Sequence, residues 1–163
     1  MAVSDATVLI TLARSGYLWL LKVLWGSIII PEAVLQEVMK GLPGKGDLTE
    51  AVNSGWIRIQ NVQNQRMVRL LQGNLRGRGE CECIILAGEI GAKVILVDDK
   101  KARKIAQQGG TEVIGTLGLL MMAVKEGVLP KEEAVKVIDL LVKKEFRLSE
   151  SLIQKAIKMI EEV

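Results

Sequence analysis

Residues 77–106 read GRGECECIILAGEIGAKVILVDDKKARKIA, and this stretch decides the fold class. Its first part predicts an apolar helix over residues 80–89, which Gly91 closes as a C-terminal cap. Residues 93–97 are an apolar run rich in branched side chains and predict a buried strand. A second helix is expected to follow and to end near Gln108. This alternation is typical of α/β proteins with a parallel sheet.

The same alternation continues on both sides of this block. Further strands are expected at residues 3–10, 27–30, 56–60 (an edge strand) and 112–114. Further helices are expected at residues 9–14, 17–26, 32–39, 47–53, within 63–79, and at 116–125, 130–144 and 149–162, the last capped by Ser149. Because no repeat or linker interrupts the pattern, we expect a single domain over residues 1–163, with the helices of 131–163 packed on it.

The composition bounds the class of protein. The chain of 163 residues is 49% hydrophobic and 25% charged, which is ordinary for a soluble globular protein with a core of its own. Cys81 and Cys83 are its only cysteines, which favours a reducing compartment. The longest apolar stretch, residues 17–31, contains Lys22 and is shorter than the ~20 residues of a membrane span. We therefore expect a cytoplasmic protein without a membrane segment.

The chain contains no histidine. Ser-His and Cys-His nucleophile pairs, histidine general bases and His-bearing zinc sites are therefore excluded. If the protein is a hydrolase, carboxylates must carry the chemistry. Clustered carboxylates favour a hard divalent metal ion.

Carboxylates stand on or near the ends of the expected strands, where open parallel sheets bind ligands. They are Asp5, Glu37, Glu80 and the pair Asp98–Asp99. Asp5 lies in an otherwise apolar strand, where an unpaired carboxylate is costly to bury, so a functional role is favoured. The others have ordinary alternatives: a solvated helix residue for Glu37, a helix N-terminus for Glu80, and an N-cap for Asp98 or Asp99.

Basic residues flank these carboxylates on both sides. Arg66, Arg69, Arg76 and Arg78 precede Glu80, and Lys100, Lys101, Arg103 and Lys104 follow the Asp pair. The net charge of +3 is too small by itself to indicate nucleic acid, and a charge run is often only a solvated helix face. As phosphate contacts we prefer Arg76, Arg78, Lys100, Lys101 and Arg103. The tryptophans Trp19, Trp25 and Trp56 are too scattered to predict a base-stacking platform.

Several segments resemble one known family. They are SDATVLI at residues 4–10, IIIPEAVLQEV at 28–38, the block at 77–106, VIGTLGLLMMAVKEGVLP at 113–130 and EFRLSESLIQKAI at 145–157. Together they resemble the PIN-domain family, and within it a prokaryotic branch related to VapC-type toxin ribonucleases that carries a GE…VDDKKAR central block. The resemblance covers nearly the whole chain, and the central block is its most specific part.

The resemblance implies a three-layer α/β/α PIN-like fold, a mostly parallel central sheet and an acidic pocket that binds Mg²⁺ or Mn²⁺. Asp5 matches the first carboxylate of the family with Thr7 as its companion hydroxyl, Glu37 the second and Glu80 the third. The fourth position maps onto Asp98–Asp99. Many relatives carry Thr-X-Asp there, so both aspartates stay candidates, with a preference for Asp99. Of these residues, Asp5, Glu80, Asp98 and Asp99 are the expected metal ligands.

The function that follows is a metal-dependent endoribonuclease, in toxin-like members the toxin of a toxin–antitoxin pair. Two divalent ions about 4 Å apart would clamp a phosphodiester of an RNA substrate. An antitoxin protein and a second copy of the chain, forming a homodimer, are the expected partners. The alternative is a non-catalytic PIN-fold module that binds RNA or protein. A phosphorylated-aspartate fold is disfavoured, because the first strand offers only Asp5-Ala6-Thr7.

Overall fold

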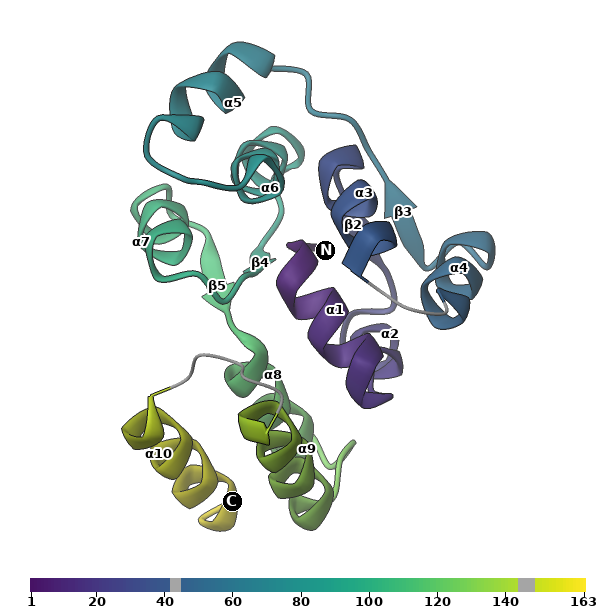
Figure 1. The fold of residues 1–163 in the computed structure, drawn as a ribbon, viewed down its shortest axis with the longest axis vertical. Coiled ribbons are helices and arrows are strands. Elements are labelled where there is room, and N and C mark those ends of the chain that lie inside the picture. Colours follow the sequence, from purple (N-terminus) through teal and green to yellow (C-terminus); the bar gives the residue numbers. More distant parts are fainter. Residues whose placement is uncertain (42–44, 144–148) are drawn as a thin grey trace. The chain divides into compact units, whose positions relative to one another are not determined.

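The computed structural model describes residues 1–41, 45–143 and 149–163 (Figure 1). The chain divides into two compact units, residues 1–115 and residues 116–163. The first unit contains the sheet and the second consists of helices. The single domain expected over residues 1–163 stays a prediction.

The sheet belongs to the first unit. Its strands are β1 (Ala2–Ser4), β2 (Ile28–Ile30), β3 (Ile57–Ile59), β4 (Val94–Leu96) and β5 (Glu112–Ile114). They pair in the order β3-β2-β1-β4-β5, and every pair is parallel. In the register of the two central strands, Ser4 of β1 lies beside Leu96 of β4. As predicted, β3 is an edge strand.

Helices connect these strands and form the second unit (Figure 1). In the first unit they are α1 (Ala6–Ser15), α2 (Trp19–Trp25), α3 (Glu32–Gly41), α4 (Gly46–Asn53), α5 (Gln65–Gln72), α6 (Arg78–Ile90) and α7 (Lys100–Gln108). In the second they are α8 (Thr116–Lys125), α9 (Lys131–Lys143) and α10 (Glu150–Glu161). The predicted helix end at residue 144 and the EFRL of residues 145–148 lie outside the described residues.

The connections run in two directions from the centre of the sheet. The chain passes from β1 to β2 and β3 towards one edge, and from β4 to β5 towards the other. Because such crossovers are almost always right-handed, the two groups of helices cover opposite faces. The protein therefore has the predicted three-layer α/β/α fold with a parallel sheet. Its topological switch point lies between β1 and β4.

The structure corrects the prediction for residues 3–10, which is not one strand. β1 ends at Ser4, Asp5 is the N-cap of α1, and Ala6 already belongs to the helix. The Oδ1 atom of Asp5 accepts a hydrogen bond from the backbone N–H of Val8 at 2.9 Å. This cap satisfies one of the N–H groups that a helix start leaves without a partner, and so the helix begins three residues earlier than predicted.

The core of the first unit is aliphatic, as the scarcity of aromatic residues predicts. Every residue of β1, β2 and β4 is buried. This is expected for inner strands of a parallel sheet that helices cover on both faces. In the second unit α8, α9 and α10 pack against one another. Within the described residues no single helix is long and apolar enough to cross a membrane, and α1 with α2 reach that length only as a pair bent by 118°.

Candidate functional site

The switch point places two of the predicted carboxylates side by side. Asp5 directly follows β1, and its backbone N–H donates to the carbonyl of Leu96, the last residue of β4, at 2.9 Å. Asp98 follows β4 after one residue, Val97. Since ligands of open α/β sheets bind outside the carboxyl ends of the strands at the switch point, this edge is the candidate site.

Asp5 is the buried member of the site, with 1% of its surface exposed. Its Oδ1 atom caps α1, whereas its Oδ2 atom is buried and has no hydrogen-bond partner among the described residues. Burial raises the pKa of Asp5 well above its usual value, and the charges of Asp98, Glu80 and Glu37 raise it further against the opposing Val8 bond. An unpaired buried carboxylate oxygen that faces other carboxylates is suited to bind a cation.

Glu80 lies in the first turn of α6 and is partly buried. Burial raises the pKa of Glu80, and the nearby charges of Asp99 and Glu37 raise it further. The carboxylates of Asp5 and Glu80 therefore share one charged neighbour, Glu37. The structure brings the predicted acidic residues, which span 95 positions of sequence, to one edge of the sheet.

Glu37 is held in this group by α6. Its Oε1 atom accepts a hydrogen bond from the backbone N–H of Gly79 at 3.2 Å. A Cβ atom at Gly79 would lie 2.6 Å from that oxygen and 3.2 Å from Cγ2 of Val34, so a larger residue there would push Glu37 out of this position and crowd Val34. Glu37 is exposed, and its place is set by this contact.

The two aspartates after β4 have different surroundings. Asp99 is the N-cap of α7, and its Oδ1 atom accepts from the backbone N–H of Ala102 at 2.9 Å. Asp98 is partly buried and its charge acts on Asp5, whereas the charge of Asp99 acts on Glu80. The capping alternative thus holds for Asp99, and Asp98 lies nearer to the buried carboxylate. Thr7, the predicted companion hydroxyl, is exposed in the first turn of α1.

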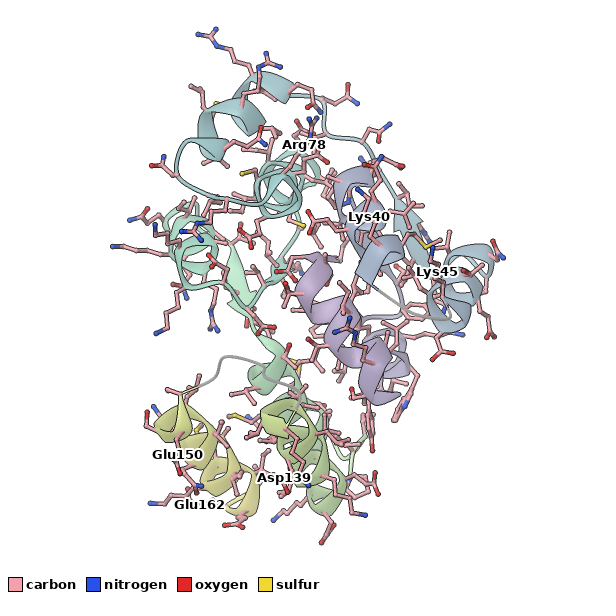
Figure 2. The ribbon with its side chains drawn as sticks, in the orientation of Figure 1. Lys40, Lys45, Arg78, Asp139, Glu150 and Glu162 are labelled. Atoms are coloured by element: carbon pink, nitrogen blue, oxygen red, sulfur yellow. The ribbon has the colours of Figure 1, made fainter. Side chains whose placement is uncertain are left out.

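The predicted phosphate contacts fall into two groups. Arg76, Lys100 and Lys101 are exposed, and the two lysines lie in the first turn of α7, directly after the aspartates. Arg78 lies at the start of α6 (Figure 2), where its Nε atom pairs with Oε1 of Glu82 at 2.9 Å. The side chains of Arg103 and Asp98 both reach the space beside Gly115, so Arg103 lies next to the site.

Two residues near the site were not predicted to matter. Glu82, one turn beyond Arg78, is only 5% exposed, and its Oε2 atom accepts from the backbone N–H of Ala33 at 3.3 Å. Cys83 is buried, and its thiol donates to the carbonyl of Ser4 at 3.2 Å. Burial raises the pKa of the Cys83 thiol well above its usual value, and Asp5 raises it further. No local pattern of the sequence indicates that Glu82 is buried or which partners the two residues contact.

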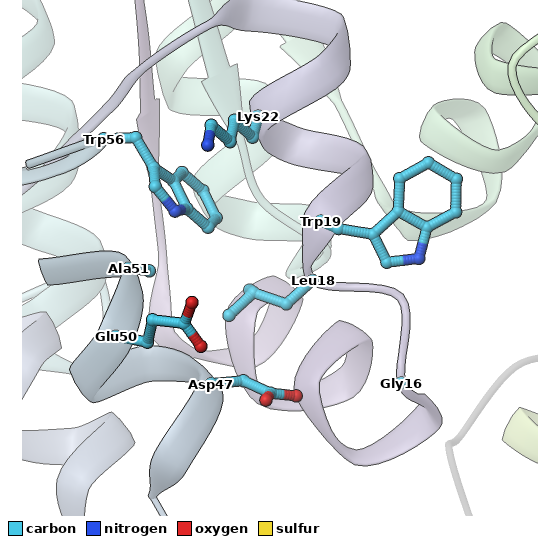
Figure 3. Close-up of a pocket in the computed structure, with 8 residues that line it drawn as sticks. All are labelled: Gly16, Leu18, Trp19, Lys22, Asp47, Glu50, Ala51 and Trp56. Carbon is cyan, nitrogen blue, oxygen red and sulfur yellow. The ribbon is translucent and has the colours of Figure 1, made fainter. Parts of the chain in front are cut away.

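A surface depression of about 280 Å³ contains none of the predicted site residues. Figure 3 shows its lining, which includes Trp19, Lys22, Glu50 and Trp56. Trp19 follows the end of α1 and Trp56 precedes β3, so the depression lies towards the amino ends of the strands, away from the carboxylates. The fold thus brings Trp19 and Trp56, which are far apart in the sequence, to one depression.

The donor set of the site fits a hard divalent cation. Its oxygens belong to carboxylates, and no residue in the ranges 1–41, 45–143 and 149–163 forms a hydrogen bond with the buried Oδ2 of Asp5. Within the described residues, no three Asp, Glu or Cys side chains are already arranged closely enough to hold a metal ion. Glu37 and Asp99 are exposed, and each has one carboxylate oxygen held by a backbone N–H.

Comparison with known proteins gives one finding. The model of the family DUF3368, described as a PIN domain, matches residues 1–162. No curated protein and no solved structure matches the chain significantly.

Proposed function

The chain belongs to the PIN-domain family, and on this premise we propose that it is a metal-dependent endoribonuclease. PIN domains are nuclease-type folds that typically use divalent metal ions. The observation that carries the proposal is the buried Oδ2 of Asp5, which has no partner in the part of the chain that the structure describes and lies where Asp98, Glu80 and Glu37 concentrate negative charge. Such a carboxylate cluster is unfavourable without a cation.

Asp5, Glu80 and Asp98 would hold Mg²⁺ or Mn²⁺, with Glu37 and Asp99 able to join them. When bound, the metal ions activate water and stabilise the leaving oxygen of a phosphodiester. The chain's own residues complete the site. Asp5 is fixed by its cap on α1, and Glu37 by Gly79. Because Asp98 acts on the buried Asp5 whereas Asp99 caps α7, we favour Asp98 as the fourth carboxylate. The sequence favoured Asp99 instead, and substitutions at both positions can decide between them.

RNA is the proposed substrate, and the proposed phosphate contacts are first of all the exposed Lys100 and Lys101, which directly follow Asp98–Asp99 in the sequence. Arg103, Arg76 and Arg78 remain candidates, although Arg78 is already engaged by Glu82. Thr7 is retained as a supporting hydroxyl. The proposal also includes a toxin role with an antitoxin protein as partner, a homodimer and a cytoplasmic location.

The proposal is tested with a pool of single-stranded and structured RNAs. The pool is incubated with the protein and Mg²⁺ or Mn²⁺, and new RNA ends are mapped by sequencing, with EDTA as a control. We expect cleavage at defined sites with metal and none with EDTA. A pool that stays intact with both metals, combined with equal RNA binding by wild type and Asp5→Asn, would instead support the non-catalytic binding module.

A further inference from the structure

Glu82 and Asp5 are the charged side chains that the structure buries most completely within the described residues. Asp5 has a role in the proposed site, whereas Glu82 has none. Its two carboxylate oxygens are both engaged. Oε2 accepts from the N–H of Ala33 in α3 at 3.3 Å, and Oε1 accepts from Nε of Arg78 at 2.9 Å. A buried carboxylate is tolerated when it is paired in this way.

The contacts of Glu82 and Glu37 are reciprocal. Ala33 and Gly79 are each the second residue of their helix, where a backbone N–H has no partner within the helix. Glu82 of α6 accepts from Ala33 of α3, and Glu37 of α3 accepts from Gly79 of α6. Each helix therefore caps the start of the other. The positive ends of both helix dipoles favour these carboxylates.

The two caps also share one interface. Ala33 and Glu37 are four residues apart on α3, and Gly79 and Glu82 are three residues apart on α6, so each pair lies on one helix face. Arg78 extends the network, because its Nη2 atom donates to Oε1 of Gln65 in α5 at 3.1 Å. The network ties α5, α6 and α3 together at the end of α6 that carries Glu80.

We propose that Glu82 is a positioning residue, which sets α3 against α6 so that Glu37 lies beside Glu80 at the cation site. This inference rests on the proposed function for its cation role. Glu82 itself is turned to Ala33 and Arg78 and acts through Glu37.

The test compares wild type, Glu82→Gln and the control Ile57→Val. The glutamine keeps the size of the side chain but loses the negative charge and one acceptor. The control removes a methyl group from β3, outside α3, α5 and α6. Two readouts are taken: hydrogen exchange at the Gly79 amide without metal, and Mn²⁺ affinity by calorimetry. The Gly79 amide is informative because its protection comes from Glu37.

We expect Glu82→Gln to speed Gly79 exchange and to weaken Mn²⁺ binding by about tenfold or more, as the loss of outer partners of metal ligands does elsewhere. Ile57→Val should leave both close to wild type. Equal results for the two variants would overturn the proposal and leave Glu82 a merely stabilising residue. A wild type that binds no Mn²⁺ would overturn the proposed function and the cation role together, whereas faster Gly79 exchange would still support the positioning of Glu37.

Discussion

The carboxylate of Glu37 accepts a hydrogen bond from the backbone N–H of Gly79, 42 positions later in the chain, at 3.2 Å. The contact exists because Gly79 has no side chain, since a Cβ atom there would lie 2.6 Å from the same oxygen. One glycine thus decides how closely α3 and α6 approach, and with them two of the proposed catalytic carboxylates.

Gly79→Ala is therefore expected to destabilise the protein, by about 1–3 kcal/mol, because the new methyl group meets Glu37 and Val34. The measurement is the free energy of unfolding in urea. Gly88→Ala is the matched control, since Gly88 lies in the same helix with open space around its Cβ position. It should stabilise the protein by about 0.5–1 kcal/mol through helix propensity. Equal effects of both substitutions would contradict the close contact.

Asp5 predicts a pH dependence of stability in the absence of metal. Burial raises the pKa of Asp5 in the folded state above its unfolded value of about 4. The fold therefore favours the protonated carboxyl of Asp5. Its contribution to the free energy of unfolding is fully present below about pH 4 and is lost as the pH rises through the pKa of Asp5 in the folded state. Asp5→Asn should keep the cap on Val8 but lack this loss, so it should be the more stable protein at pH 7.

Thermal unfolding of wild type and Asp5→Asn between pH 4 and pH 8, with EDTA present, checks this expectation. The difference between the two melting temperatures should grow with pH. Adding Mn²⁺ at pH 7 should raise the melting temperature of wild type, since a ligand at about 100 times its Kd stabilises by roughly 2.7 kcal/mol. A difference in melting temperature that is independent of pH would show that burial does not raise the pKa of Asp5 in the folded protein.

Substituting the two aspartates after β4 one at a time distinguishes which of them is the fourth carboxylate of the site. Asp98→Asn is expected to lower the rate of RNA cleavage by more than about 100-fold, because even outer partners of metal ligands cost 10–100-fold. Asp99→Asn should cost less, since asparagine caps α7 as well as aspartate does. The check is the cleavage rate of each variant at saturating metal. The reverse order would identify Asp99 as the fourth carboxylate.

Lys100 and Lys101 are expected to contact phosphates of the RNA. Each lysine that does so adds about 0.7 to the slope of log affinity against log salt for a single strand. Replacing either by alanine should lower that slope and weaken the binding of all sequences alike, as measured by fluorescence anisotropy in EDTA. Lys93→Ala is the control, because Lys93 is exposed at the amino end of β4. If the slope is unchanged in both variants, Lys100 and Lys101 do not contact phosphates and belong to a solvated face of α7.

Much of the fold could be predicted from local signals. The strand expected at residues 112–114 and the helix expected at 116–125 are observed as β5 and α8, with the same bounds. The failure at residues 3–10 has a physical cause. Asp5 interrupts an apolar run, and its side chain favours a helix start over a longer strand.

The site could be predicted only in part. The carboxylates could be predicted because acidic residues on or near the ends of parallel strands indicate a ligand site. Gly79 and Glu82 were not, because their roles depend on the packing of α3 against α6, which no local pattern of the sequence reports. The depression between Trp19 and Trp56 is likewise a product of the tertiary fold.

The central claim is that the carboxylates around Asp5 support metal-dependent cleavage of RNA. The most direct measurement is the cleavage rate of one RNA pool by wild type and Asp5→Asn, side by side, over a titration of Mn²⁺. We expect wild type to cleave with a saturable dependence on Mn²⁺ and Asp5→Asn to be slower by more than about 100-fold at every concentration. Equal rates for the two proteins would contradict the account.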